Sequence, residues 1–160
     1  MSDCCTTPNS QTQQTSAGYM RYCPHCSQKG KRVNIKTVKA MLAVSLHKIQ
    51  VDHSYLFCRT ADCPVVYFAD DGQQTLTECD LREQVYQKHP DAEDVFICYC
   101  FRHTLKSIRM ELLETGQSTV AATVTAGTKS HQCACEIRNP QGNCCLGNIN
   151  AAVKCAELAL

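Results

Sequence analysis

The chain has little of what a large hydrophobic core requires. Tryptophan is absent, and aromatic residues make up only 6% of the 160 residues. No apolar run approaches the about 20 residues that span a bilayer. The net charge of +1 arises from interspersed charges of both signs. We therefore expect modest cores, no membrane span, and no electrostatic surface for nucleic acid or anionic lipid.

The start of the chain lacks a secretory signal, because it is polar and has neither a basic start nor an apolar core. We therefore expect a cytoplasmic protein, whose thiols stay reduced. Cysteine is abundant, with 14 residues, and in this setting favours metal sites over disulfides. Residues 1–19 are expected to form a disordered tail. Within it, Cys4 and Cys5 either have no fixed role or form a mobile site for a soft ion such as Cu(I).

The first cysteine motif combines Cys-x2-Cys with a later Cys-x4-Cys. It comprises Cys23 and Cys26, followed by Cys58 and Cys63. Two such knuckles can bring four sulfurs into the tetrahedron that Zn²⁺ accepts. We expect one structural zinc here, with two disulfides as the main alternative. A weaker alternative is that His25, inside the first knuckle, replaces one thiolate.

The residues around the knuckles predict a small mixed fold. Apolar residues suited to strands precede each knuckle, residues 33–36 predict a strand, and Thr37 predicts the cap of a helix over residues 38–49. The helix carries an apolar stripe at helical spacing, which we expect to be core: Val38, Met41, Leu42, Leu46 and Ile49. Residues 20–70 are therefore predicted to form a zinc-ribbon-like subdomain.

A polar, acidic segment follows, and we expect residues 71–94 to connect two metal-bearing halves. A short helix is predicted over residues 78–87, and Pro90 ends it. Cys79 is interpreted as an unpaired, partly buried thiol. No two carboxylates share an apolar setting that would separate their pKa values, so no catalytic acid–base pair is indicated.

The second cysteine group lies in residues 95–160, predicted to be a helical subdomain. Cys98 and Cys100 form a Cys-x-Cys segment able to grip one iron of an iron–sulfur cluster, while later cysteines supply the other iron. Helix starts immediately after Cys100 and Cys145 would direct free backbone N–H groups toward the sulfurs of an anionic cluster. The whole chain is thus expected to be α+β.

Three helices are predicted in this half. The first is capped by Thr104 and stopped by Gly116. The second begins at a Ser118 cap and ends at Gly127. The third begins just after Cys145, at Leu146 or Asn148, and runs toward Leu158.

These motifs resemble a known family. Four features look like those of the N-terminal domain of CopZ-type copper chaperones. They are Cys98-Tyr-Cys100-Phe, the two-helix spacer, Asn139-Pro-Gln-Gly-Asn-Cys144-Cys145, and the zinc knuckle with Cys63-Pro-Val-Val-Tyr-Phe68. The resemblance covers about residues 22–152, and the second half is also similar to bacterioferritin-associated ferredoxin. It implies one zinc on the four knuckle cysteines and one [2Fe-2S] cluster, held by Cys98, Cys100, Cys135 and Cys145.

Two departures from the family pattern bear on these assignments. Cys133 and Cys144 each lie beside one of the last two implied ligands, so either can substitute for its neighbour. Full-length family members also carry a small copper-transfer domain with its own Cys-x-x-Cys. Here the Cys-x-x-Cys is the zinc knuckle, so we expect no copper-delivery part.

The resemblance implies a redox protein of copper handling that passes single electrons and reduces Cu²⁺ to Cu⁺. As an enzyme it would be at most a one-electron metal reductase. Its partners would be copper ions, a copper carrier or transporter, and a redox protein. The alternatives are an electron-transfer partner of the bacterioferritin-associated-ferredoxin kind, a Cu(I) carrier using the spare thiols, and a sensor of oxygen or iron.

No hydrolase or transferase pattern is found, because the chain has neither a glycine-rich phosphate loop nor a nucleophile elbow. His103 and His131 lie near the proposed cluster cysteines. Each is interpreted as a surface residue, or as a group that tunes or ligates the cluster.

Overall fold

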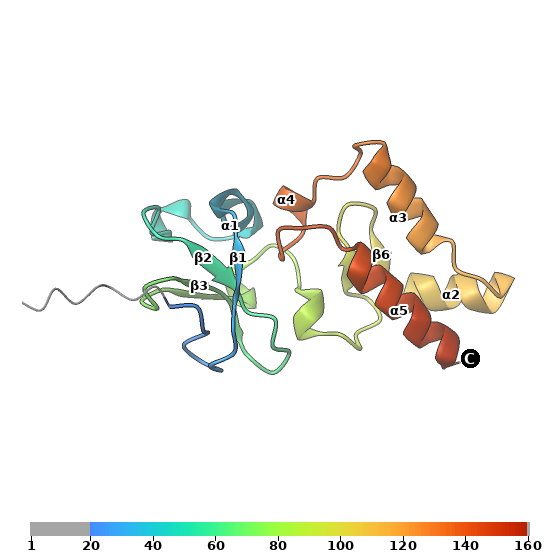
Figure 1. Ribbon diagram of the computed structural model, residues 1–160, viewed down its shortest axis with the longest axis horizontal. Coiled ribbons are helices and arrows are strands. Elements are labelled where there is room, and N and C mark those ends of the chain that lie inside the picture. The colour runs from blue at the N-terminus through green and yellow to red at the C-terminus, as the bar shows by residue number, and fades with distance from the viewer. Residues whose placement is uncertain (1–19, 160) are drawn as a thin grey trace, which may run out of the picture.

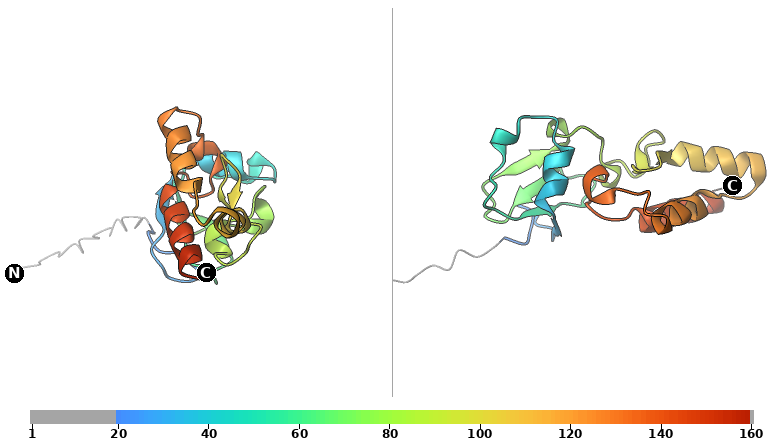
Figure 2. Two further views of the ribbon diagram at one scale, coloured as in Figure 1. Left: turned by 90° about the vertical axis from the view of Figure 1, so that its right-hand side faces the viewer. Right: turned by 90° about the horizontal axis from the view of Figure 1, so that it is seen from above.

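The structure is a computed structural model that describes residues 20–159. Cys4, Cys5 and the tail expected over residues 1–19 lie outside the described residues. A small antiparallel sheet forms the N-terminal half and helices form the C-terminal half, as expected for an α+β chain. The two halves lie end to end along the longest axis of the molecule (Figures 1 and 2).

Four antiparallel strands form the sheet, in the order β1-β2-β3-β4. They are β1 (Lys31–Val33), β2 (Tyr55–Phe57), β3 (Val65–Ala69) and β4 (Thr75–Thr77). All three residues of β2 and all five of β3 are buried, so the centre of the sheet is covered on both faces. The strand predicted over residues 33–36 overlaps β1 only at Val33, because Asn34 already caps the helix to which Ile35 and Lys36 belong.

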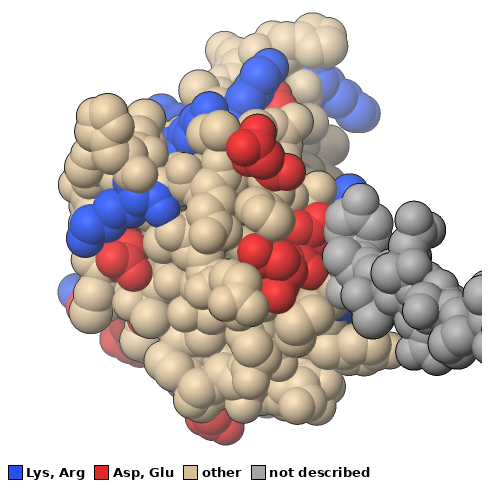
Figure 3. Space-filling model, turned by 90° about the vertical axis from the view of Figure 1, so that its left-hand side faces the viewer, with Lys and Arg blue, Asp and Glu red and all other residues tan. Residues whose placement is uncertain are grey.

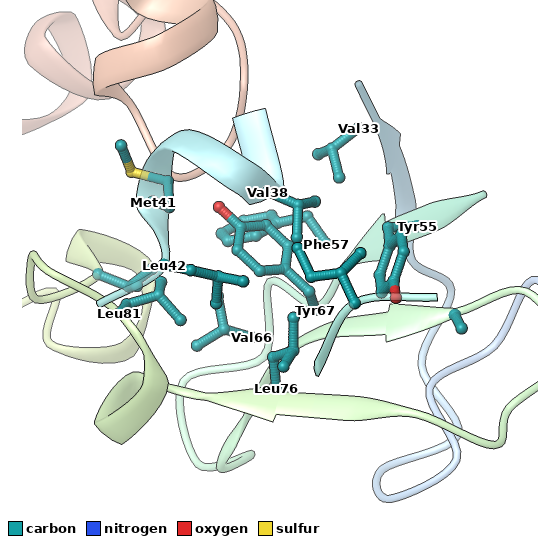
Figure 4. Packing of buried hydrophobic residues seen from close by; sticks show 13 residues of the cluster. Val33, Val38, Met41, Leu42, Tyr55, Phe57, Val66, Tyr67, Leu76 and Leu81 are labelled. Atoms are coloured by element: carbon teal, nitrogen blue, oxygen red, sulfur yellow. The ribbon is translucent and has the colours of Figure 1, made fainter. Parts of the chain in front are cut away.

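Helix α1 (Ile35–Met41) packs on the sheet over a core of aromatic and branched side chains (Figure 4). Its cap is Asn34, whose side chain accepts a hydrogen bond from the backbone N–H of Lys36 at 2.9 Å. Thr37 is therefore not the cap that the sequence predicted. It lies inside the helix and is fully buried.

Helix α1 also ends earlier than predicted, at Met41. The next residue, Leu42, is extended and pairs with Leu81 in an isolated antiparallel bridge, which draws the backbone out of the helix. Four of the five predicted stripe residues are buried, but Leu46 is 50% exposed in the 3-10 turn η1 (Leu46–Lys48).

The segment after the sheet forms two 3-10 turns instead of the predicted helix, η2 (Glu78–Asp80) and η3 (Tyr86–Lys88). Between them Leu81 is extended and pairs with Leu42, and residues 82–83 form a bend. Leu81 and Val85 are buried in the core of the sheet half. Cys79 is exposed, not partly buried as predicted.

The described C-terminal half contains a two-stranded sheet and four helices. The strands are β5 (Phe96–Cys98) and β6 (His103–Thr104). The helices are α2 (Leu105–Thr115), α3 (Val120–Lys129), α4 (Cys135–Arg138) and α5 (Leu146–Leu158). Helices α2, α3 and α5 pack with β5 around one core. Short α4, which the sequence did not predict, lies beside α1 of the sheet half (Figure 1).

Several helix boundaries match the sequence predictions. The Thr104 side chain caps α2 by accepting from the Ser107 N–H at 3.1 Å, and Gly116 ends α2 in the left-handed conformation with φ 74°. Helix α5 begins directly after Cys145. Helix α2, however, begins at Leu105 and not immediately after Cys100, because a turn and β6 intervene.

Helix α3 differs from its prediction at both ends. Its cap residue is Thr119, not Ser118, and the helix continues past Gly127 to Lys129. Gly127 has a packing role instead, because a Cβ atom there would lie 2.3 Å from Cζ of Phe101. The absent side chain lets α3 approach the turn that follows Cys100.

The surface agrees with the charge pattern of the sequence. On the face shown in Figure 3, basic and acidic side chains are interspersed among uncharged residues. Among the described helices, none is both long enough and apolar enough to cross a membrane.

Candidate metal centres

The two zinc-type knuckles are turns at the ends of strands in the sheet half. In the first, the Cys23 N–H donates to the Gln28 carbonyl at 2.8 Å, and the Ser27 N–H donates to the Cys23 carbonyl at 2.8 Å. In the second, the Cys58 N–H donates to the Val66 carbonyl at 2.8 Å as the chain leaves β2. Backbone hydrogen bonds of the protein thus fix the conformation of both turns.

The four knuckle sulfurs converge on one point. All four Sγ atoms lie within 4.8 Å of one another. Sγ of Cys23 lies 3.8 Å from that of Cys63, and Sγ of Cys26 lies 3.6 Å from that of Cys58. A zinc tetrahedron with Zn–S distances of about 2.3 Å has sulfur–sulfur edges of about 3.8 Å. The donor set and its spacing therefore fit Zn²⁺.

Burial and hydrogen bonding make the four knuckle thiols differ in exposure and in pKa. Cys23, Cys58 and Cys63 are buried, whereas Cys26 is partly exposed. Burial raises the pKa of the Cys63 thiol to about 12. Burial also opposes ionisation of Cys26, but hydrogen bonds to Thr60, the Gln28 backbone and neighbouring thiols outweigh it and lower its pKa to about 6. Cys26 is thus the most readily ionised thiol of the group for which a shift is found.

Two further side chains reach this centre. The Thr60 hydroxyl lies 3.5 Å from Sγ of Cys26, and Nδ1 of His25 lies 3.7 Å from Sγ of Cys63. The sequence drew attention to His25 but not to Thr60. Thr60 lies between the two cysteines of the Cys-x4-Cys knuckle, and this position in the sequence is the signal that would have indicated a residue near the metal centre. With four sulfurs already grouped, His25 is placed to hydrogen-bond a thiolate from outside the group.

The second cysteine group forms two sulfur pairs across long sequence separations. Sγ of Cys100 lies 3.7 Å from Sγ of Cys135, and Cys145 is the neighbouring thiol with the largest effect on the pKa of Cys98. The Cys-x-Cys segment therefore points each of its sulfurs at a different later cysteine. The sequence predicts instead that Cys98 and Cys100 act together at one iron.

The two pairs differ in exposure. Cys98 is 0% exposed and Cys145 is 2% exposed, so they form an inner pair. Cys100 and Cys135 are partly exposed and form an outer pair. Burial, together with the neighbouring thiols, raises the pKa of Cys135.

Backbone donors surround these sulfurs. A hydrogen bond with Cys145 lowers the pKa of Cys98 to about 6, against burial, and bonds from the Phe101 and Cys100 backbone N–H groups add to the effect. The Ala134 N–H donates to Sγ of Cys100 at 3.3 Å. Helix α5 starts at the residue after Cys145, so its free N–H groups lie beside this group. These donors stabilise negative charge on the Cys98 and Cys100 sulfurs, whereas neighbouring thiols and burial raise the pKa of Cys135 and Cys145.

The remaining described cysteines divide into two kinds. Cys133 is partly exposed and lies two residues before Cys135, and Cys144 is exposed and directly precedes Cys145. Cys79 and Cys155 are exposed and belong to neither group. His103 is partly buried in β6, and burial lowers its pKa, while His131 is exposed.

The comparisons with known proteins agree with this geometry. The CopZ zinc-binding domain family matches residues 20–82, which contain all four knuckle cysteines. The crystal structure of the CopZ N-terminal domain from Archaeoglobus fulgidus is similar, with a TM-score of 0.67 and 30% sequence identity. That match covers 81% of this chain and 95% of the archaeal domain. No curated protein matches the chain. The chain belongs to the family of CopZ N-terminal domains.

Proposed function

We propose that this chain is a redox protein of copper handling with one structural zinc and one [2Fe-2S] cluster. Zinc is assigned to the four knuckle cysteines. The cluster is assigned to the inner pair, Cys98 and Cys145, and the outer pair, Cys100 and Cys135. The observation that carries the cluster assignment is the 3.7 Å approach of the Cys100 and Cys135 sulfurs, with the buried Cys98 and Cys145 in the same core.

The two cysteine groups differ in a way that matches two different metals. A single zinc needs four sulfurs that are mutual neighbours, as in the knuckle group. In the described chain, the second group does not form one set with all ligand atoms within 4.8 Å. Two separate pairs suit a centre with two irons, each taking two thiolates.

The protein environment supports an anionic cluster. Four thiolates give such a centre net negative charge, and the Ala134 N–H bond to Cys100 together with the start of α5 after Cys145 offsets that charge. The buried inner pair limits water access, and the partly exposed outer pair gives a short path to the surface. These residues hold the centre and leave one edge open to a partner.

When bound, such a cluster accepts and donates single electrons. One electron from a reduced redox protein would enter at the outer pair, and the same electron would convert Cu²⁺ to Cu⁺. Cys133 and Cys144, each within two residues of a proposed ligand and at least partly exposed, favour copper as acceptor, because thiolates bind the soft Cu⁺ product. The chain is thus at most a one-electron metal reductase.

The same geometry leaves two other functions to be distinguished. An electron-transfer partner of the bacterioferritin-associated-ferredoxin kind would use the cluster without copper. A Cu(I) carrier would use the exposed thiols without electron transfer. The exposed Cys144, directly before Cys145, is the observation that keeps the carrier function in consideration.

The first experiment is metal and acid-labile sulfide analysis of anaerobically purified protein, together with its visible spectrum. We expect about one zinc, two irons and two sulfides per chain, with absorption that bleaches on reduction. Zinc without sulfide or visible absorption, even after anaerobic reconstitution, would exclude the cluster.

The second experiment tests copper reduction directly. Reduced protein is mixed anaerobically with Cu²⁺ and a chromogenic Cu(I) chelator, and we expect about one Cu⁺ per cluster as the visible absorption of the oxidised cluster returns. An intact cluster that leaves Cu²⁺ unreduced would favour the ferredoxin-like function. Cu(I) binding that is lost when Cys133 and Cys144 are replaced by serine would favour the carrier.

A further inference from the structure

A layer of buried polar side chains lies between the two metal centres and belongs to neither sulfur group. Lys88 is 9% exposed, Gln141 is 6% exposed and Asn139 is 2% exposed. Burial of such groups is costly unless they are hydrogen-bonded or paired. Their partners therefore show what this layer holds in place.

Lys88 connects the layer to the zinc half. Its Nζ donates to the Thr60 carbonyl at 2.7 Å, and the Thr60 hydroxyl lies 3.5 Å from Sγ of Cys26. Within residues 20–159, no carboxylate forms an ion pair with Lys88. A buried ammonium needs compensating charge, and a zinc tetrathiolate close to Thr60 supplies net negative charge.

The preceding residue of the same 3-10 turn connects the layer to the cluster half. Nε2 of Gln87 donates to Oε1 of Gln141 at 2.7 Å. Gln141 in turn donates from Nε2 to the Cys144 carbonyl at 3.0 Å, directly before Cys145 of the inner pair. Asn148, in the first turn of α5, donates to the same Gln141 oxygen at 3.2 Å.

Two more hydrogen bonds hold the loop that Gln141 belongs to. The Tyr67 hydroxyl, from the core of β3, donates to the Pro140 carbonyl at 2.5 Å. Nδ2 of Asn139 donates to the Asn143 carbonyl at 2.8 Å within the loop. Tyr67 therefore holds the loop between Cys135 and Cys145 against the sheet half, while the Asn139 bond stabilises the loop internally.

We propose that turn η3 couples the two metal centres, because Lys88 holds the zinc knuckle while Gln87 holds Gln141, which positions Cys145. Lys88, Gln87 and Gln141 are positioning residues. This inference rests on the proposed cluster. Occupancy of the zinc site then affects how firmly the cluster is retained, and because coupling between sites is reciprocal, the cluster affects zinc retention as well.

The size of the effect follows from the behaviour of partners that orient metal ligands. Removing such a partner typically lowers metal affinity by about 10- to 100-fold. Gln141→Leu removes the donor to the Cys144 carbonyl and leaves that carbonyl without this partner. Lys88→Met keeps most of the side-chain volume but removes the donor to the Thr60 carbonyl.

The test uses the full chain with both metals bound and follows two release rates. Zinc release is measured with a chromogenic chelator, and cluster loss is measured by bleaching of the visible band in the presence of an iron chelator. We expect Gln141→Leu to speed bleaching about 10-fold and to change the electron paramagnetic resonance spectrum of the reduced cluster. The matched control is Gln117→Leu at an exposed loop position.

Lys88→Met is the decisive variant, because its contact lies in the zinc half. We expect it to speed both zinc release and bleaching, whereas Lys39→Met, on the exposed face of α1, changes neither. If Lys88→Met does not fold, Gln87→Leu and zinc-stripped wild-type protein take its place, and both should bleach faster.

Two outcomes would contradict the proposal in different ways. Faster zinc release with unchanged bleaching in Lys88→Met, or unchanged bleaching of zinc-stripped protein, would overturn the coupling while leaving the cluster assignment intact. Wild-type protein that holds zinc but never a cluster would instead overturn the proposed function and the coupling with it.

Gln141→Glu separates positioning from simple packing. Glutamate retains an acceptor for Gln87 and Asn148, but it cannot donate to the Cys144 carbonyl. We expect it to bleach as fast as Gln141→Leu, and bleaching at the wild-type rate would show that the donor to Cys144 is not what holds the cluster.

Discussion

The Sγ atoms of Cys100 and Cys135 lie 3.7 Å apart, although 35 positions separate the two residues in the chain. Helices α2 and α3 lie between them in sequence and fold back so that the two ends meet. The Ala134 N–H, from the residue before Cys135, donates to the Cys100 sulfur and fixes the approach of the two segments. Folding of the helical half therefore assembles the outer sulfur pair.

The neighbouring cysteines 144 and 145 should differ sharply in their effect on the cluster. Cys145 is 2% exposed and lies in the same buried core as Cys98, while Cys144 is exposed. We expect Cys145→Ser to abolish stable cluster binding and Cys144→Ser to retain it, as measured by sulfide content and visible absorption. The reverse result would assign the ligand to Cys144.

Removal of one knuckle sulfur should release zinc while leaving all four proposed cluster ligands in place. Cys58 is buried and lies 3.6 Å from Cys26, so Cys58→Ser removes one vertex of the tetrahedron. We expect zinc content well below one per chain and a lower melting temperature, because structural zinc contributes directly to folding. Cys79→Ser, at an exposed thiol outside both groups, is the control and should keep its zinc.

The hydrogen bond from Tyr67 to Pro140 should contribute to the stability of the joined halves. Tyr67→Phe removes the donor and leaves the buried Pro140 carbonyl without this partner, at a cost of about 1–3 kcal/mol in the free energy of unfolding. Chemical denaturation followed by circular dichroism measures the change. Tyr22→Phe, at a side chain that is 57% exposed, should leave stability unchanged, and equal effects of the two changes would contradict the role of this bond.

The core behind the inner sulfur pair should be sensitive to cavities. Ile149 is 0% exposed on α5, one turn after Cys145, and packs in the core of the helical half. Ile149→Ala should cost about 2–5 kcal/mol. Leu113→Ala, at a residue on α2 that is 71% exposed, should change the unfolding free energy by no more than about 0.5 kcal/mol. A loss at Ile149 as small as that at Leu113 would show that this core is not closely packed.

Local sequence patterns anticipated several elements correctly because their causes are local. Thr104 caps α2 through a bond to a residue three positions away, and Gly116 ends it by adopting a positive φ. The grouping of cysteines into knuckles and a later set is likewise visible in their spacing. Such features need only neighbouring residues, so sequence reasoning can reach them.

The predictions that differ from the structure concern elements decided by distant residues. Helix α1 ends at Met41 because Leu42 pairs with Leu81, and the helix predicted over residues 78–87 is replaced by turns for the same reason. Gly127 was interpreted as a helix end, but it accommodates Phe101. In each case a contact from another part of the chain outweighed the local preference.

The sequence by itself determined the supply of thiols, their spacing, the balance of charge and the local caps, because these depend on residue type and on near neighbours. Only the tertiary structure decided which sulfurs meet. It paired Cys98 with Cys145 and Cys100 with Cys135, and it placed the polar layer around Gln141 between the two centres. Those contacts depend on how the helices and the sheet pack, since burial of apolar side chains from distant segments brings the two ends of each pair together.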